Sequence, residues 1–413
     1  MKKLKLSITS EVGKLKGVII HTPGQELENM TPENAEKALY SDILSLSVAS
    51  KEYAQFKGVL KKLVKNVFEV EELLLDILEN KNVKRELVEN ISENEDLEYI
   101  KNTLLNMKPK ELARTLISGL ILKRDTLTDY LKDARYSLVP LHNLFFTRDA
   151  SVSVGGEVSI SKMASKVRAR EAIIMEAIFN YSNLIEAETF KPDYSNDEIT
   201  IEGGDLLIAR EDILCIGMGP RTTAKGIDFI VKHFKSKNIK KHIIVQELPS
   251  TPESFIHLDM IFTFLDKDIC MIHEPVVFND RYRTIHIDNT KDDVVIKEVK
   301  NLLVALENLG MKLTPMFCGG RDDTWYQERE QWHSGANFLT LAPGKVIGYS
   351  RNQHTIKYLE NNGFSIFKAD DVISGKVNID KVDKYVITIE GSELARGGGG
   401  CRCMSMPVLR DEV

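Results

Sequence analysis

The feature of this sequence that most restricts its fold is an irregular repeat of strand, turn, strand and helix. Four passages share the strand, turn and strand, FTRDASVSVGGEVSI, EGGDLLIAREDILCIG, HLDMIFTFLDKDICMI and GANFLTLAPGKVIGYS, and a helix-like segment follows all but the third. They align on four polar residues, Asp149, Asp205, Asp259 and Asn337. On that alignment the second strand of each unit is expected near Val158, Ile213, Ile269 and Val346. A single unit cannot bury its own apolar face, so the repeat predicts an α/β protein of radially arranged or stacked units. The N-terminal VGKLKGVIIHTP can supply a fifth unit.

Residues from about 52 to 137 have a different character. Between Gly58 and Gly119 there is no glycine, and Leu, Lys and Glu dominate. Stretches such as FKGVLKKLVKNVFEVEELLLDIL carry apolar residues at helical spacing. We therefore expect a helical insertion domain over residues 52–137 and an α/β catalytic domain formed by residues 1–51 and 138–413.

Charge and cysteine content exclude several classes of protein. A net charge of -6 over 413 residues argues against a nucleic-acid binder, which normally carries a basic excess. No apolar run approaches the roughly 20 residues that span a bilayer, so no membrane association is expected. The five cysteines are odd in number and unevenly spaced, which is untypical of a disulfide framework and predicts a reducing cytoplasm.

The repeat also predicts where chemistry occurs. If the units circle an axis, the motifs FTRD, EGGD, HLD and GAN converge on one central site. One Asp beside Gly most often makes only a turn, but three carboxylate motifs in register favour convergence. The candidate residues are Asp149, Glu202, Asp205, His257, Asp259 and a terminal cysteine. Several buried carboxylates repel one another and need a cation between them.

That cation is either a metal ion or a cationic substrate. Asp, Glu and His do bind metals, but no HExxH, paired-His or CxxC…CxxC spacing is present. A guanidinium fits carboxylates bidentately and leaves its central carbon open to a thiolate. His257 then protonates the departing ammonia and later activates water. Since it lies two residues from Asp259, we expect it on the same strand face.

The thiol comes from the terminal segment RGGGGCRCMSMP, residues 396–407, which contains Cys401 and Cys403. A phosphate-binding loop is disfavoured because the glycines lead to the strand-like MSMPVLR and not to a helix. Glycines allow close approach of the backbone to a ligand. Because free chain ends fray, a reactive cysteine here predicts that the terminus folds back into the centre of the protein.

At these residues the chain resembles the arginine deiminases of the guanidino-group-modifying superfamily. The matching stretches are HTPGQELENMTPEN (21–34), NLFFTRD (143–149), IEGGD (201–205), GMGPRTT (217–223), HLDMIFT (257–263), REQWHSGAN (329–337) and CMSMP (403–407). The resemblance implies a pentein fold, a five-bladed α/β propeller of strand-strand-helix-strand units with an inserted helical bundle. It also implies hydrolysis of L-arginine to L-citrulline and ammonium through a covalent S-alkylthiouronium, without cofactor or metal. We expect a cytoplasmic homo-oligomer whose partner is this small molecule.

The resemblance assigns roles by position. Cys403 matches the nucleophile, His257 the general acid/base and Glu202 its supporting carboxylate, while Asp149 and Asp259 match the residues that grip the guanidinium. The residues matched to substrate binding are Asn143, Phe146, Arg168, Asp205 and Arg221.

One departure from the family pattern lies in the loop before the nucleophile, and others are His142, His333, Ser334 and Tyr53. Gly398 stands where many members have an arginine that helps to close the loop over the substrate. We therefore expect Arg396 or Arg402 to take the place of that arginine, or the loop to close less tightly. Cys401 is interpreted as a bystander. Three alternatives remain at this point: an amidinotransferase of the same fold, a metal-dependent hydrolase that uses the Asp/Glu/His cluster, and a non-catalytic arginine-binding protein.

Overall fold

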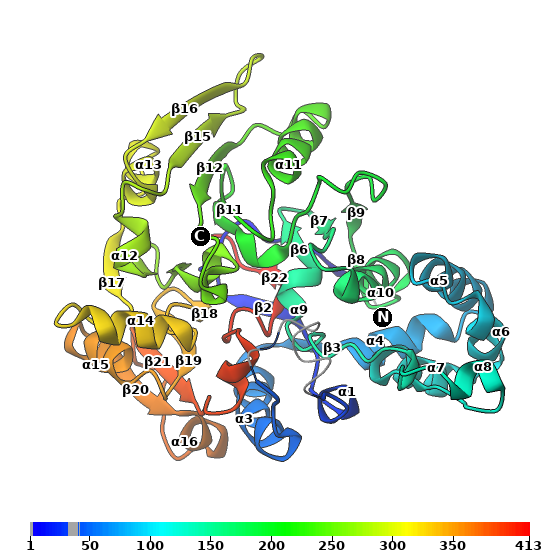
Figure 1. Ribbon diagram of the computed structural model, residues 1–413. Helices are drawn as coiled ribbons and strands as arrows, with labels where there is room; N and C mark the ends of the chain where they lie inside the picture. Colours follow the sequence, from blue (N-terminus) through cyan, green and yellow to red (C-terminus); the bar gives the residue numbers. More distant parts are fainter. Residues whose placement is uncertain (1–2, 32–39, 41) are drawn as a thin grey trace.

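The computed structural model describes residues 3–31, 40 and 42–413, and it is a mixed α/β structure built from open sheets (Figure 1). Residues 32–34, the end of the first family-like motif, lie outside the described residues. No helix in the described part of the chain combines the length and the apolar character needed to cross a bilayer.

Five of the described sheets begin in the same way, with two antiparallel strands followed by a third strand parallel to the second. In the order first, second and third strand, they consist of β6 (Ser151–Val154), β7 (Glu157–Ile160) and β9 (Glu188–Phe190); β10 (Leu206–Arg210), β11 (Ile213–Met218) and β12 (His242–Glu247); β13 (Phe262–Phe264), β14 (Ile269–Ile272) and β17 (Thr314–Phe317); β18 (Leu339–Ala342), β19 (Lys345–Tyr349) and β21 (Tyr385–Ile389); β22 (Met406–Arg410), β2 (Leu15–Ile20) and β3 (Asn66–Glu69). The second sheet is extended by β15 (Thr284–Asp288) and β16 (Val295–Val299), and the fourth by β20 (Ser365–Lys368).

The predicted positions of the second strands are confirmed, because β7, β11, β14 and β19 contain Val158, Ile213, Ile269 and Val346. These strands read as nearly continuous apolar runs, and Ile213, Ile269 and Val346 are all buried. Such runs are typical of strands that are covered on both faces.

In each unit a helix lies on the connection between the second and the third strand, because a parallel strand pair needs a long crossover connection. These helices are α3 (Leu46–Leu63), α10 (Ala169–Tyr181), α11 (Ala224–Ser236), α13 (Leu302–Asn308) and α15 (Gln353–Asn361), and Figure 1 shows them outside the sheets. The side chain of Thr223 caps α11 and that of Asn301 caps α13. The inner strands β2, β6, β11 and β22 lie toward the middle of the view.

The two ends of the chain meet in the fifth sheet. Strand β22 pairs antiparallel with β2, so that Met406 lies opposite Ile19 and Arg410 opposite Leu15. The backbone N–H of Arg410 also donates to the carbonyl of Ser7 at 3.0 Å. The expectation that the C-terminal segment folds back into the protein is therefore confirmed.

A separate block of helices follows β3. It contains α4 (Val70–Leu78), α5 (Lys81–Asn94), α6 (Glu98–Asn106), α7 (Pro109–Ser118) and α8 (Leu127–Tyr130), with a short pair of strands, β4 (Leu120–Ile121) and β5 (Tyr136–Leu138). Its apolar faces share one core cluster with α10. The expected start at residue 52 falls inside α3, and β3 pairs with β2. Strand β3 thus belongs to the fifth sheet and α3 to the connection between β2 and β3; helical periodicity does not reveal which partner a helix packs against.

The remaining elements are short. They are β1 (Leu4–Lys5), β8 (Ile185–Glu186), α1 (Gln25–Glu28), α9 (Thr147–Ala150), α12 (Glu274–Val277), α14 (Thr324–Trp332), α16 (Ala369–Ser374) and the 3-10 helices η1 (Lys166–Arg168), η2 (Gly203–Asp205), η3 (Glu253–Phe255), η4 (Leu258–Met260) and η5 (Leu394–Gly397).

Candidate active site

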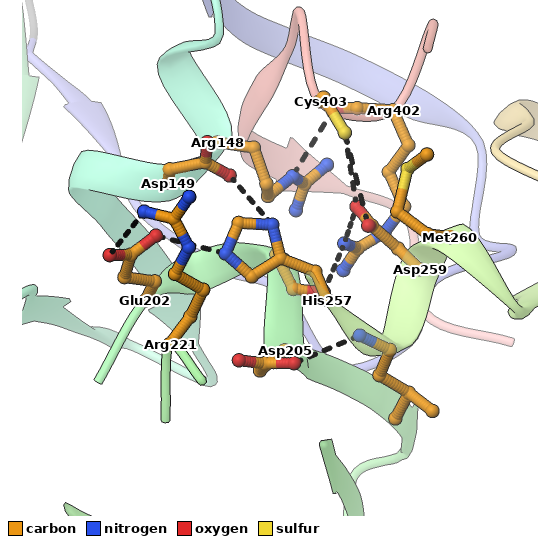
Figure 2. Close-up of polar contacts among 12 residues, drawn as sticks. Arg148, Asp149, Glu202, Asp205, Arg221, His257, Asp259, Met260, Arg402 and Cys403 are labelled. Carbon is orange, nitrogen blue, oxygen red and sulfur yellow. Dashed lines mark hydrogen bonds and ion pairs between the residues drawn. The ribbon is translucent and has the colours of Figure 1, made fainter. Parts of the chain in front are cut away.

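Each of the five sheets presents one polar residue just before its first strand. Asp149 lies in α9, Asp205 in η2 and Asp259 in η4, whereas Asn337 and Cys403 precede β18 and β22 directly. All five are buried. Convergence of the repeat motifs is thus observed, and the cysteine completes the set as the residue of the fifth sheet (Figure 2).

The thiol of Cys403 is 3% exposed and lies between an amide and a carboxylate. The Asn337 Nδ2 is 3.2 Å from Cys403 Sγ, and the Asp259 Oδ2 is 3.6 Å from it on another side. Burial, followed by the charges of Asp259 and Asp149, holds the pKa of the Cys403 thiol well above its usual value. As long as no further cation is bound in the site, the thiol of Cys403 is therefore protonated at neutral pH.

The glycine run allows the cysteine loop to pack against side chains of neighbouring sheets. A Cβ on Gly399 would overlap the ring of Phe146, and one on Gly400 would lie 2.7 Å from the Cβ of Asn337. Gly398 has a φ of +85°, which favours glycine. The hydroxyl of Tyr349 donates to the Gly399 carbonyl at 3.0 Å and holds the loop. Close backbone approach, as the sequence predicted, is what these glycines provide.

The imidazole of His257 lies between two carboxylates. Its Nε2 is 2.9 Å from Glu202 Oε2, and its Nδ1 is 3.7 Å from Asp149 Oδ1 (Figure 2). Burial favours the neutral ring, but the Asp149 charge and the Glu202 hydrogen bond outweigh it and raise the pKa of His257 to about 9. Burial also opposes ionisation of Glu202, yet the His257 hydrogen bond and the charge of Arg221 lower its pKa to about 2. A charged imidazolium–carboxylate pair results at neutral pH.

The expectation that His257 and Asp259 share a strand face is wrong. His257 is the N-cap of η4 and has extended backbone, whereas Asp259 lies within that 3-10 helix. Consequently the ring turns toward Glu202, while the Asp259 carboxylate turns toward Cys403. His257 and Asp259 therefore contact different groups of the site, Glu202 and Cys403 respectively.

Both carboxylates matched to guanidinium binding already contact a guanidinium of the chain itself. Arg168 Nη1 is 2.9 Å from Asp149 Oδ2, and its Nη2 is 2.8 Å from Glu171 Oε2. Arg402 Nη1 is 2.8 Å from Asp259 Oδ2. The site is therefore shaped and charged to hold planar cations of this kind.

A small cavity of about 20 Å³ connects these groups, which is room for about one water molecule. It is lined by Asn143, Phe146, Asp149, Arg168, Arg221, Ile256, His257, Gly397, Gly398, Gly399 and Cys403. Four of the five residues matched to substrate binding thus surround the thiol and the imidazole. Glu202 and Asp259 lie behind this lining and contact it through His257 and Cys403.

Asp205 is the matched residue that does not line the cavity. Its Oδ1 accepts a hydrogen bond of 2.8 Å from the backbone N–H of Leu258, the first residue of η4. Burial raises the pKa of this carboxyl group to about 7. Asp205 therefore holds the turn that carries His257 and Asp259 from outside the cavity lining.

Among the described residues, one group of His, Cys, Asp and Glu side chains is close enough to share a metal ion: Asp149, Glu202 and His257, whose ligand atoms lie within 4.8 Å of one another. Each of these three already forms an ion pair, Asp149 with Arg168 and Glu202 with His257. The same oxygen atoms are suited to a guanidinium.

The cysteine loop shows two further departures from expectation. Arg396 pairs with Asp42 and Glu393 near the surface, and Arg402 points away from the cavity toward Asp259 and Glu11. Neither arginine lines the cavity, so the expected replacement for an arginine at Gly398 is not observed. Cys401 is completely buried outside the cavity, and burial raises the pKa of its thiol; its interpretation as a bystander stays a prediction.

Sequence reasoning missed Glu11, which receives two hydrogen bonds from Arg402 at 3.1 and 3.0 Å. No local signal could have linked two residues at opposite ends of the chain. Asn337, in contrast, stood in the repeat alignment beside three aspartates but was not assigned to the site. Its position in the alignment was the signal.

The arrangement of the sheets places the chain among proteins of the pentein fold. SxtG, an amidinotransferase of Microseira wollei, aligns with a TM-score of 0.54 at 14% identity, covering 99% of this chain and 98% of that one. The N-terminal domain of ArgZ, a cyanobacterial arginine dihydrolase bound to its substrate, aligns with a TM-score of 0.53 at 12% identity, covering 95% and 98%.

Sequence comparison then identifies the family. The arginine deiminase family model matches residues 36–410. The arginine deiminase of Borrelia garinii subsp. bavariensis is 33% identical over 99% of this chain and 98% of its own length. That of Bacillus cereus is 32% identical over the full length of both chains. The chain belongs to the arginine deiminase family.

Proposed function

We propose that this protein hydrolyses L-arginine to L-citrulline and ammonium through a covalent intermediate on Cys403. The observation that carries the proposal is the arrangement of one cavity: it joins the Cys403 thiol to the His257 imidazole, beside carboxylates that already hold guanidinium groups. Family membership supports the same reaction.

Substrate binding requires the cavity to widen, because about 20 Å³ cannot hold an arginine side chain. The substrate guanidinium displaces Arg168 from Asp149 and lies between Asp149 and Asp259. Arg168, once released, joins Arg221 and Asn143 around the α-carboxylate and amino group of the substrate. Phe146 covers the aliphatic part. Exchange of one guanidinium for another preserves the charge balance, which makes binding in a buried site feasible.

The first half-reaction forms a carbon–sulfur bond and breaks a carbon–nitrogen bond. Because the bound cation stabilises the thiolate, the Cys403 thiol releases its proton to solvent when substrate binds, and the thiolate attacks the central carbon of the guanidinium. His257 is charged below its pKa of about 9, so it can donate a proton to the departing nitrogen. Ammonia leaves, and an S-alkylthiouronium remains on Cys403.

The second half-reaction restores the enzyme. Neutral His257 accepts a proton from a water molecule, whose oxygen attacks the same carbon. The carbon–sulfur bond breaks, the thiolate leaves and citrulline is released. Glu202 stabilises the imidazolium that forms, because its carboxylate lies 2.9 Å from the ring. No cofactor takes part in either half.

The architecture proposed with this function is a five-bladed propeller. The five sheets with their common strand order are its blades, and the residues that precede the first strands face its axis. Residues 70–137 form a helical insertion between the third and the first strand of two blades. The cytoplasmic location and the homo-oligomeric state remain predictions.

The decisive experiment is to incubate the reduced protein with arginine and measure citrulline and ammonium, with and without EDTA and with an added amine acceptor. Stoichiometric citrulline and ammonium, insensitive to EDTA, are expected. Absence of citrulline at every pH contradicts the proposal. Loss of activity with EDTA favours a metal-dependent hydrolase, and an amidino group on the acceptor favours an amidinotransferase.

A further inference from the structure

We propose that Asn337 is a further catalytic residue, whose side-chain amide donates a hydrogen bond to the Cys403 sulfur and stabilises its thiolate. The inference rests on the proposed function, since it concerns the nucleophile of that reaction. Asn337 Nδ2 is 3.2 Å from Cys403 Sγ, and the residue is 1% exposed. A buried donor at this distance acts on the atom that attacks the substrate.

The orientation of the amide is determined by its other contacts. Asn337 Oδ1 accepts hydrogen bonds from the backbone N–H groups of Arg402 at 2.9 Å and Cys403 at 3.2 Å. Because only the oxygen can accept them, Nδ2 must face the sulfur. Nδ2 also contacts the carbonyl oxygen of Asp259 at 3.1 Å, a second acceptor that requires a nitrogen there. The donor is therefore held in place before the substrate arrives.

Asp205, the equivalent residue of another sheet, shows which of the contacts of Asn337 requires an amide. Asp205 Oδ1 accepts the backbone N–H of Leu258, the residue before Asp259. In the same way, Asn337 Oδ1 accepts the backbone N–H of Arg402, the residue before Cys403. A carboxylate can thus make the structural bond between neighbouring sheets. The amide at 337 adds a donor, and a carboxylate there would instead place negative charge against the sulfur.

The charges around Cys403 make this donor valuable. Asp259 and Asp149 raise the pKa of the thiol, and Arg402 lowers it although it is paired with Asp259 and Glu11. The buried Tyr349 hydroxyl donates to the Gly399 carbonyl of the cysteine loop at 3.0 Å. Asn337 is a neutral group that favours the thiolate without repelling the cationic substrate. Gly400 allows its close approach, since a Cβ there would lie 2.7 Å from Asn337.

The test is the variant Asn337→Asp, which has nearly the same shape and retains the acceptor for the backbone N–H groups. The readout is the pH dependence of Cys403 alkylation by iodoacetamide, quantified on the peptide that contains this cysteine. We expect the apparent pKa of the thiol to rise by about one unit or more, so that alkylation at pH 7 slows about tenfold. The kcat for arginine should fall about 10- to 100-fold, with KM changed less than about threefold.

Two further variants make the result interpretable. Asn289→Asp makes the same change at a buried amide beside β15, where Nδ2 donates to Ile239, and its thiol profile should equal that of the wild type. Asn337→Ala removes the donor without adding charge, so it should slow alkylation less than Asn337→Asp does, and it decides the question if the aspartate variant does not fold.

An unchanged alkylation profile in a folded Asn337 variant overturns the inference, as does an equal shift in Asn289→Asp. Because alkylation is measured without arginine, its outcome is independent of turnover. A wild-type protein that is alkylated normally but forms no citrulline contradicts the proposed function instead.

Discussion

The Nε2 atom of His257 lies 2.9 Å from the Oε2 atom of Glu202, and both side chains are shielded from solvent. The imidazolium of this pair lies next to the cavity proposed to bind a cation, and the carboxylates of Glu202 and Asp149 on the two sides of the ring offset the repulsion. The general acid is thereby kept protonated at neutral pH, which is what release of ammonia requires.

Removing the charge of Glu202 should therefore shift the pH dependence of the reaction. In Glu202→Gln, the burial that lowers the pKa of His257 is less opposed, so this pKa should fall from about 9 by about one unit or more. Activity that needs the imidazolium is lost as pH rises through this pKa, so the basic limb of kcat/KM should move to lower pH. A pH–rate profile measures the shift; an unchanged basic limb contradicts the assignment of His257.

The buried carboxyl group of Asp205 should lower the free energy of unfolding as pH rises. Its pKa is about 7 in the folded protein and near 3.8 without the fold, so the unfolded state loses its proton first. Its contribution is thus most favourable below pH 4 and declines up to pH 7, by on the order of a few kcal/mol. Asp205→Asn retains the acceptor for Leu258 and removes this decline. Its melting temperature relative to the wild type should rise between pH 4 and 7, and a constant difference would count against the buried carboxyl.

The two neighbouring cysteines should differ sharply when replaced. Cys403→Ser should reduce turnover by about four orders of magnitude or more, because the nucleophile is lost. Cys401→Ser should retain most of the activity, since that thiol is buried outside the cavity. Steady-state citrulline formation compares the two, and equal losses would mean that the nucleophile has been assigned wrongly.

Arg221 should determine affinity for the substrate carboxylate. Its side chain is 11% exposed at the cavity and lies 3.8 Å from Glu202. A charge-assisted hydrogen bond contributes about 1.5–3 kcal/mol, so Arg221→Ala should raise KM for arginine about 10- to 100-fold. Agmatine lacks the carboxylate and should be a poor substrate for wild type and variant alike. A larger loss on agmatine than on arginine would show that Arg221 acts elsewhere.

The glycine loop should be sensitive to a single methyl group. In Gly399→Ala the new Cβ overlaps the ring of Phe146, so the loop that carries Cys403 must shift. We expect kcat/KM to fall at least about tenfold, since small displacements of reacting groups are costly. Gly156→Ala, in the exposed turn between β6 and β7, has open space around it and serves as the control. Equal activities of the two variants would contradict tight packing of the loop.

Much of the site was predictable because its residues occupy equivalent places in a repeat. Asp149, Asp205 and Asp259 precede their strands at similar distances, and that spacing alone indicated convergence. Their individual contacts were not predictable. Asp205 and Asp259 look alike in sequence, yet one holds the backbone of Leu258 and the other faces the thiol. Which side chain reaches the cavity depends on how neighbouring sheets are placed.

By itself the sequence predicted four pairs of strands, because apolar periodicity and turn residues act over about ten residues, while its resemblance to a family indicated the candidate nucleophile. Only the tertiary structure decided the fifth sheet, in which β22 pairs with β2, and the contact of Arg402 with Glu11 across 391 positions. Pairing of the chain ends depends on the burial gained when the whole set of sheets assembles. No local pattern records that gain, and it is this pairing that places Cys403 beside Asn337 and Asp259.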